Sequence, residues 1–341
     1  MKIDRKNLLK KLNEMTPGLS AKGILEQSKS FVFAGGSLVT FNDEILARMD
    51  SPLGDLTMVV DASDLLKVLE KLPDDELEIK KKKHELVLKG SKKAAGISLT
   101  AEVLLPFDAV PTPKNFKTIG SGSISKLLIQ AAMTCGKDES QPLTTYVHVR
   151  EDLIEACDNY RLLRAVGDTG FPDEVLIPAT TLLALKAVSF VKVAIGKGWC
   201  HFLTKTGTTY SLRTSHEEYS IDTSDIIKLR KPKKIRLPSN LPEVLERASI
   251  MGNTGYDAYA EVTLSKNKLT IKTQKEGGWY RERRKVKWDG DDMTLHVHPE
   301  LLVDLLSRAR KVELDETRMK ITTKRITFVI RISIAPRSEV V

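Results

Sequence analysis

Pairs of apolar residues at helical spacing occur three times along the chain with a long and nearly constant period. The first members are Leu8, Leu127 and Val244, so the steps are 119 and 117 residues. A second pair follows each of these, at steps of 117 and 119 residues, and the second pairs begin at Leu65, Leu182 and Leu301. Self-similarity at a fixed period indicates a repeated architecture, and each pair predicts an amphipathic helix.

The residues between the helices alternate between apolar and polar side chains, and each alternating stretch contains a short turn. The turns fall at Gly35-Gly36, Glu151-Asp152 and Lys266-Asn267, which are 116 and 115 residues apart. This pattern predicts β-hairpins. Many strands with short turns and few helices favour an α+β fold, in which helices cover one face of antiparallel sheets.

Proline and charge collect where the periodic pattern lapses, in segments 106–121 and 228–238. Such segments are typical of domain boundaries. We therefore predict three domains, spanning residues 1–116, 117–232 and 233–341. The second helix of each unit has its own start signal, namely Asp61 with Asp64, Pro178, and Pro299 after His298.

The composition is that of a folded globular protein. Of the 341 residues, 41% are apolar and 29% are charged, and only three are cysteines. Small disulfide scaffolds are excluded, and a reducing cytoplasmic setting is expected, because the cysteines match no zinc or redox spacing. The chain contains no apolar stretch of membrane-spanning length. Its formal charge of +9 favours an anionic partner without identifying one.

Catalytic chemistry finds little support in the residue pattern. A metal-dependent nuclease remains an alternative, because it would need clustered carboxylates or histidines. Two clusters have such residues, and each has a simpler interpretation as a turn or a helix start: Asp289, Asp291 and Asp292, and His296, His298 and Glu300. A glycine-rich phosphate loop is absent from the sequence. We therefore expect no enzyme activity, no metal and no cofactor.

The densest basic and aromatic stretch runs from Trp279 to Lys287 and includes Arg281, Arg283 and Lys285. One interpretation is a platform that stacks and clamps a single strand, which would make the chain a single-stranded nucleic-acid-binding protein without ring topology. The others are a plain edge strand, or a contact with a partner or DNA. The residues alone do not choose among these.

Three segments, in order and at the period, resemble the bacterial sliding clamp, the processivity subunit of the replicative DNA polymerase. They are residues 4–12, 60–73 and 157–162. The resemblance implies a homodimer joined head to tail, in which six domains close a ring with sheets outside and paired helices inside. Duplex DNA would pass through the hole, held without base readout, and a clamp-loader ATPase would open the ring. Clamps of this family are commonly acidic outside, whereas this chain is net basic.

The resemblance makes the cations near the helices candidates for contact with duplex DNA, and Lys22 stands where the family usually carries an arginine. A solvated helix face is the other interpretation of each. The candidates are Lys6, Lys10, Lys11, Lys22, Lys67, Lys71, Lys126, Lys186, Arg247, Arg308 and Arg310.

The family also holds its polymerase and other partners in an apolar pocket between the second and third domains. The corresponding residues here are Asp158, Tyr160, Arg161, Leu162, Phe328 and Ile330. An ordinary alternating strand is the other interpretation of Tyr160 and Leu162. The segment 328–336 differs from the family's usual C-terminal sequence, so we expect a different partner peptide.

Overall fold

The structure is a computed structural model that describes residues 1–23, 25–100, 102–119, 123–252 and 259–331, with the backbone alone at residues 123, 304 and 308. The chain forms two compact units. The first contains Met1–Ser125 and Gly170–His216, and the second contains Lys126–Thr169 and Glu217–Val341. In the described part of the chain, no helix is long and apolar enough to span a membrane.

The same order of elements occurs three times: one strand, a helix, four strands, a second helix and three strands. The first copy has β1 (Lys2–Asp4), α1 (Arg5–Met15), β2 (Ser30–Ala34), β3 (Ser37–Phe41), β4 (Ile45–Asp50), β5 (Met58–Asp61), α2 (Ala62–Lys71), β6 (Glu76–Lys81), β7 (Glu85–Lys89) and β8 (Ala94–Thr100). The second has β9 (Lys117–Thr118), α3 (Ser123–Ala132), β10 (Tyr146–Arg150), β11 (Leu153–Cys157), β12 (Arg161–Val166), β13 (Val175–Pro178), α4 (Ala179–Ala184), β14 (Phe190–Gly196), β15 (Trp199–Thr204) and β16 (Thr209–Arg213).

The third copy has β17 (Lys233–Arg236), α5 (Leu241–Ser249), β18 (Ala260–Ser265), β19 (Lys268–Lys275), β20 (Gly278–Lys285), β21 (Met293–Val297), α6 (Pro299–Arg308), β22 (Lys311–Leu314), β23 (Arg318–Thr322) and β24 (Ile326–Arg331). The predicted repeat and the predicted α+β class are confirmed. The division into three domains at residues 116 and 232 stays a prediction, because the compact units divide the second copy between them.

The first unit contains one 12-stranded antiparallel sheet with the order β1-β6-β7-β8-β5-β2-β3-β4-β16-β15-β14-β9. The sheet passes from the first copy to the second where β4 pairs with β16. In this junction Ile45 lies opposite Leu212, and Arg48 lies opposite Thr209. The backbone groups at the edge of one copy are thereby satisfied by the next.

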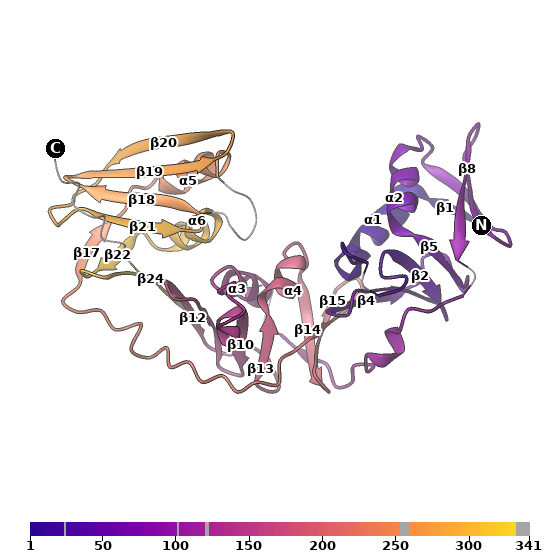
Figure 1. Ribbon diagram of the computed structural model, residues 1–341, viewed down its shortest axis with the longest axis horizontal. Coiled ribbons are helices and arrows are strands. Elements are labelled where there is room, and N and C mark those ends of the chain that lie inside the picture. The colour runs from indigo at the N-terminus through magenta and orange to yellow at the C-terminus, as the bar shows by residue number, and fades with distance from the viewer. Residues whose placement is uncertain (24, 101, 120–122, 253–258, 332–341) are drawn as a thin grey trace. The chain divides into compact units, whose positions relative to one another are not determined.

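The second unit contains a similar junction. Its strands follow the order β10-β11-β12-β24-β23-β22-β17, and β12 of the second copy pairs with β24 of the third. Arg161 lies opposite Ile330 and Arg164 lies opposite Thr327. The remaining strands of this unit form a separate sheet, β20-β19-β18-β21, drawn in orange to gold in Figure 1.

Local sequence explains the turns and most of the helix starts. The hairpin turn at Gly35-Gly36 has φ of 55° and 72°, and the turn at Lys266-Asn267 has φ of 40° and 64°, as two-residue hairpins of type I′ require. Asp61 caps α2, as predicted, and accepts a hydrogen bond from the backbone N–H of Asp64 at 2.9 Å. Pro178 lies one residue before α4 rather than at its first position.

The segment between the first and second copies covers one face of the first unit's sheet. Leu105 and Val110 of this segment belong to an apolar cluster with Phe41, Leu46 and other strand residues, and Phe107 packs against it. A connecting segment is therefore part of the core, which fixes the face on which it runs.

Candidate functional site

Helix α1 carries the densest group of predicted DNA-binding lysines. Asp4 caps its N-terminus by accepting a hydrogen bond from the backbone N–H of Asn7 at 2.5 Å. Leu8 and Leu12 are fully buried and fix the orientation of the helix. The lysines that this orientation leaves accessible are Lys6 and Lys10, which are exposed, and Lys11, which is half-buried.

Arg5 joins α1 to the C-terminal end of α2. Its Nη1 donates to the carbonyl of Leu69 at 2.8 Å and its Nε donates to the carbonyl of Asp74 at 2.9 Å. Both predicted lysines of α2, Lys67 and Lys71, are exposed. Two acids on the same helix, Asp64 and Glu70, are exposed as well. The positive charge of the helix pair therefore comes mainly from α1.

The other predicted cations are scattered. Lys126 on α3, Lys186 just after α4, Lys22 after α1 and Arg310 before β22 are all exposed. The side chain of Arg308 lies outside the described residues. Exposure is compatible with contact to DNA, so these residues stay predictions.

Arg247 on α5 is held by the edge strand β20. Its Nη2 donates to the carboxylate of Glu282 at 3.0 and 3.1 Å, and its Nε lies 3.3 Å from the hydroxyl of Tyr280. Burial opposes the ionised form of Glu282, but the hydrogen bonds from Arg247 and Tyr280 hold its pKa below the usual value. A contact between Arg247 and DNA would have to replace this ion pair.

The predicted partner segment begins with a tight turn between β11 and β12. Oδ1 of Asp158 accepts hydrogen bonds from the backbone N–H groups of Tyr160 at 2.7 Å and Arg161 at 2.6 Å. Oδ2 of Asp158 accepts two more from the Arg161 guanidinium, at 2.9 and 3.0 Å. These four hydrogen bonds hold the turn, which leaves Tyr160 63% exposed.

The remaining predicted pocket residues lie on opposite faces of one sheet. Leu162 lies opposite Val329, whereas Phe328 lies opposite Leu163 and Ile330 lies opposite Arg161. Successive strand residues point to opposite faces, so Leu162 and the pair Phe328 and Ile330 are separated by the sheet. All three are buried. The structure therefore does not bring the six residues together on one surface.

The Leu162 face is covered by residues 217–228, which we call the cover segment and which the sequence pattern had not assigned to the site. Its Ile221, Ile226 and Ile227 pack against a buried cluster of Cys157, Leu162 and Val329. A signal was present: Tyr219, Ile221 and Thr223 have the period-two spacing of an extended chain on a surface.

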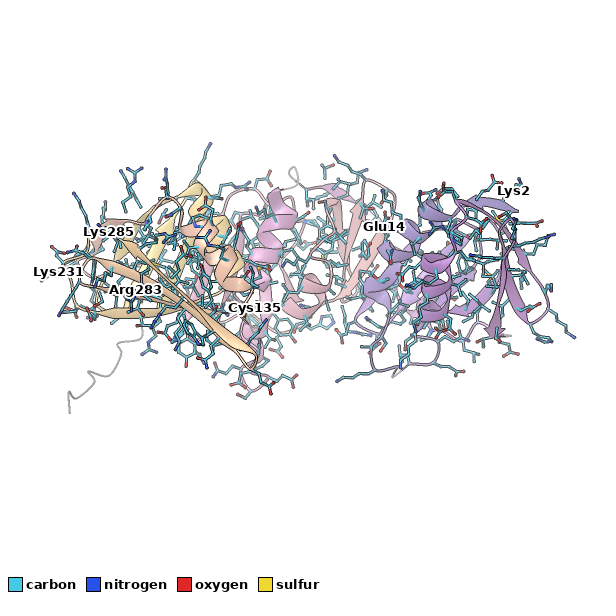
Figure 2. All side chains as sticks on the ribbon, turned by 90° about the horizontal axis from the view of Figure 1, so that it is seen from above. Lys2, Glu14, Cys135, Lys231, Arg283 and Lys285 are labelled. Carbon is cyan, nitrogen blue, oxygen red and sulfur yellow. The ribbon has the colours of Figure 1, made fainter. Side chains whose placement is uncertain are left out.

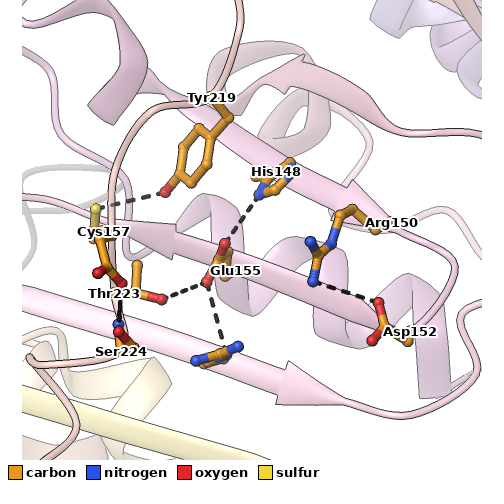
Figure 3. Close-up of polar contacts among 10 residues, drawn as sticks. His148, Arg150, Asp152, Glu155, Cys157, Tyr219, Thr223 and Ser224 are labelled. Carbon is orange, nitrogen blue, oxygen red and sulfur yellow. Dashed lines mark hydrogen bonds and ion pairs between the residues drawn. The ribbon is translucent and has the colours of Figure 1, made fainter.

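A buried polar network ties the cover segment to the sheet (Figure 3). Glu155 is at its centre: Oε1 lies 3.0 Å from His148 Nδ1, and Oε2 accepts a hydrogen bond from the Thr223 hydroxyl at 2.7 Å. Arg164 Nε lies 3.8 Å from Oε2, which is ion-pair distance. The ring of Tyr219 stacks on that of His148, with centroids 4.2 Å apart.

Comparisons with known proteins agree on the architecture. No protein-family model matches the chain, and no curated protein matches it. Among solved structures, it is similar to the DNA polymerase sliding clamp from Bacillus subtilis, with 17% identity, a TM-score of 0.71 and coverage of 98% of this chain and 99% of that one. The DNA polymerase III beta chain from Streptococcus pneumoniae gives 18% identity, a TM-score of 0.72 and the same coverage.

The chain has the sliding-clamp fold. In this fold the Glu155 network occupies the sheet that joins the second and third copies, on the face under the cover segment. Burial alone would raise the pKa of Glu155, but hydrogen bonds from His148 and Thr223 hold it below its usual value. Burial raises the pKa of the Cys157 thiol, so this cysteine is protonated at neutral pH. Among the described residues, no three histidine, cysteine or acidic side chains are grouped to hold a metal ion.

The lowered pKa of Glu155 predicts a pH-dependent attachment of the cover segment. A carboxylate with a lowered pKa stabilises the fold above the unfolded pKa of about 4.3, and this contribution is lost as the pH falls through the folded pKa. Glu155→Gln should lower the free energy of unfolding by about 1.5–3 kcal/mol at pH 7 and by less below pH 4. Urea unfolding at both pH values measures this difference.

The control for this prediction is Glu151→Gln, which changes an exposed glutamate in the turn before β11. It should shift the unfolding free energy by less than about 0.5 kcal/mol. An effect of Glu155→Gln that is equal at pH 7 and pH 4 would contradict a role for the charge.

Proposed function

We propose that this chain is a DNA sliding clamp, a processivity factor that encircles duplex DNA as a head-to-tail homodimer. One observation carries the proposal. The chain joins its repeated copies edge to edge twice, and the two edges that correspond to a third junction have no such partner within the described part of the chain. The solved structures of the same fold are named as DNA polymerase sliding clamps, which supports the assignment.

The two internal junctions share one register. Ile45 lies opposite Leu212 in the first, and Arg161 lies opposite Ile330 in the second. Counted from the hairpin turns of each copy, Ile45 is equivalent to Arg161, and Leu212 is equivalent to Ile330. The two junctions are therefore equivalent strand pairings with the same register.

The same count identifies the partners of a third junction. Strand β20 is equivalent to β4 and β12, and strand β8 is equivalent to β16 and β24. We infer that β20 of one chain pairs with β8 of a second chain, with Tyr280 opposite Ile97 and Arg283 opposite Ala94. Two such junctions close a ring of six copies.

Both edges are available for this pairing. Strand β20 ends its sheet, and β8 pairs with β7 along residues 94–98 but with β5 only at residues 99–100. Unpaired edges of this length promote aggregation unless they are covered. The carboxylate of Glu85 also lies over Gly96, 2.7 Å from where a Cβ would stand. In the inferred register Arg281 of the second chain faces Gly96, so the two charges are complementary.

Thiol crosslinking tests the inferred dimer. With Ala94→Cys and Arg283→Cys in one chain, directly opposed Cβ atoms would lie about 4.5–5.5 Å apart across the junction. Mild oxidation or a short bifunctional thiol reagent should convert most of the protein to a covalent dimer on a denaturing gel. The three native cysteines are buried and should contribute little.

The matched control combines Ala94→Cys with Arg284→Cys, because Arg284 is the next residue of β20 and points to the other face. It should give little dimer. Equal crosslinking in the two variants, or monomer alone in both, would refute the register and with it the ring.

The ring would hold DNA by topology and by nonspecific attraction to phosphates. We propose that each copy is one domain, that the sheets lie outside, and that the paired helices face the duplex, with the lysines of α1 as the strongest contributors. The chain would have no catalytic step of its own. A clamp-loader ATPase would supply ATP hydrolysis, and the replicative polymerase in the cytoplasm would be the main client.

We propose that the client docks at the turn that precedes β12. Exposed aromatic side chains on rigid turns are suited to interface hot spots, and Tyr160 is such a residue beside a fixed Arg161. Asp158 would act by holding the turn. Leu162, Phe328 and Ile330 would support this surface from within the sheet, because each is buried.

Substitutions at Tyr160 and Leu162 distinguish a residue that contacts the polymerase from one that stabilises the sheet beneath the contact surface. Tyr160→Ala should weaken polymerase stimulation while changing the free energy of unfolding by less than about 0.5 kcal/mol. Leu162→Ala should cost about 2–5 kcal/mol of stability, because it leaves a cavity under the cover segment. Primer extension and urea unfolding measure the two effects. The exposed Val166 on β12 offers the control Val166→Ala, and stimulation that is equal for Tyr160→Ala and this control would exclude Tyr160 from the contact.

A further inference from the structure

We propose that one face of the sheet β20-β19-β18-β21 binds a single strand of DNA. The opposite face packs against α5, because the Thr273 hydroxyl donates to the carbonyl of Ala248 at 2.7 Å and Tyr280 contacts Arg247. The face turned away from α5, here called the outer face, carries Thr270 and the alternate residues of each strand. The other members used below are Tyr259, Glu261, Lys268, Lys272, Gln274, Trp279, Arg281, Arg283 and Lys285.

Comparison of the three copies shows that the outer face departs from its equivalents. Strands β3, β11 and β19 are equivalent in the three copies. The fifth residue of β3 is Phe41, which lies opposite Leu46, and the fifth residue of β11 is Cys157, which lies opposite Leu162. These four residues are buried under connecting segments. In the third copy the equivalent pair is Lys272 with Arg281, and both side chains are exposed. Cations have replaced apolar residues at a position that elsewhere belongs to the core.

The cations of the outer face oppose one another directly. Lys268 lies opposite Lys285, and Lys272 lies opposite Arg281. Like charges opposite each other destabilise a sheet, so the fold gains nothing from this arrangement by itself. On the described strands of this face, Glu261 is the acid that offsets five cations. Figure 2 labels Arg283 and Lys285 on this sheet. Such an excess fits an extended polyanion.

Two exposed aromatic side chains lie in one row at the end of the charged rows. Trp279 on β20 lies opposite Gln274 on β19. When the register between β18 and β19 is continued past the start of β18, Tyr259 lies opposite Gln274 on the other side of β19. Trp279 is 61% exposed and Tyr259 is 58% exposed. Two strand spacings separate them by about 9.6 Å. The Arg281 guanidinium lies 5.5 Å from the centroid of the Trp279 ring.

Exposed aromatics beside cations on an open sheet bind single strands by stacking bases and attracting phosphates. Duplex DNA offers no free base face to these rings, and an acidic polypeptide would use the cations alone. The preference for DNA over RNA rests on the proposed function, because a clamp on a primed template has an unpaired template strand beside it. The attraction to an unpaired strand rests on the outer face itself. In the inferred ring the Glu85 carboxylate of the second chain would face Arg281, and the other four cations would remain for the strand.

Titration of the full-length protein with a labelled 20-nucleotide oligo(dT) tests the proposal by anisotropy and by tryptophan fluorescence. Trp199 and Trp288 are buried, so quenching should report Trp279. Trp279→Ala should abolish the quenching and weaken binding at least about fivefold. Lys272→Thr with Arg283→Thr should weaken binding roughly tenfold and flatten its salt dependence. Threonine already occupies neighbouring positions of this face.

The matched control is Lys205→Thr with Lys324→Thr, which removes two exposed lysines from turns that are not part of the outer face and should leave affinity within twofold. The proposal is overturned if the control weakens binding as much, or if a 20-base-pair duplex or poly-glutamate binds the protein as tightly with the same dependence on Lys272 and Arg283. Equal or tighter binding of oligo(U) overturns the assignment to DNA. Thiol crosslinking measures ring formation independently of oligonucleotide binding. Failure of the ring proposal can therefore be distinguished from failure of the proposal that the outer face binds single-stranded DNA.

Discussion

The pairing of sheet edges is the interaction on which the rest of the structure depends. Each copy of the repeat ends in strands whose backbone N–H and C=O groups need partners, and within the described residues these partners come from strand pairing between copies. Inside the chain, β4 pairs with β16 and β12 pairs with β24. Both pairings supply the missing backbone partners, and both have the same register. The edges β8 and β20 have the same need, and a second copy of the chain is the simplest partner that meets it in the same way.

The connecting segments show how each junction is completed. Residues 103–110 cover the first junction with apolar side chains, and the cover segment closes the second with both an apolar cluster and the Glu155 network. A junction between chains has no connecting segment. The equivalent surface of the third copy is correspondingly polar, with Lys272 and Arg281 where the other copies bury Phe41 with Leu46 and Cys157 with Leu162. Because this surface does not have to pack against a connecting segment, its residues can bind another ligand.

The sequence was sufficient for the features that arise from neighbouring residues. The hairpin turns at 35–36 and 266–267, the cap at Asp61 and the threefold order of elements follow from local pattern. The junctions could not be predicted, because Arg48 and Thr209 are 161 residues apart and no local signal specifies their pairing. For the same reason the resemblance to sliding clamps assigned Leu162, Phe328 and Ile330 to one pocket, although the register puts Leu162 on the other face. The Arg247–Glu282 ion pair was missed likewise.

Retention on closed and open DNA tests encirclement most directly. The protein is loaded onto a nicked circular duplex by its clamp loader, separated from free protein by gel filtration, and the circle is then cut once. If the ring encircles the duplex, the protein stays with the circle and is lost within minutes after the cut, at a salt concentration that leaves retention on the uncut circle intact. Equal loss from circular and linear DNA would contradict a ring closed around the duplex.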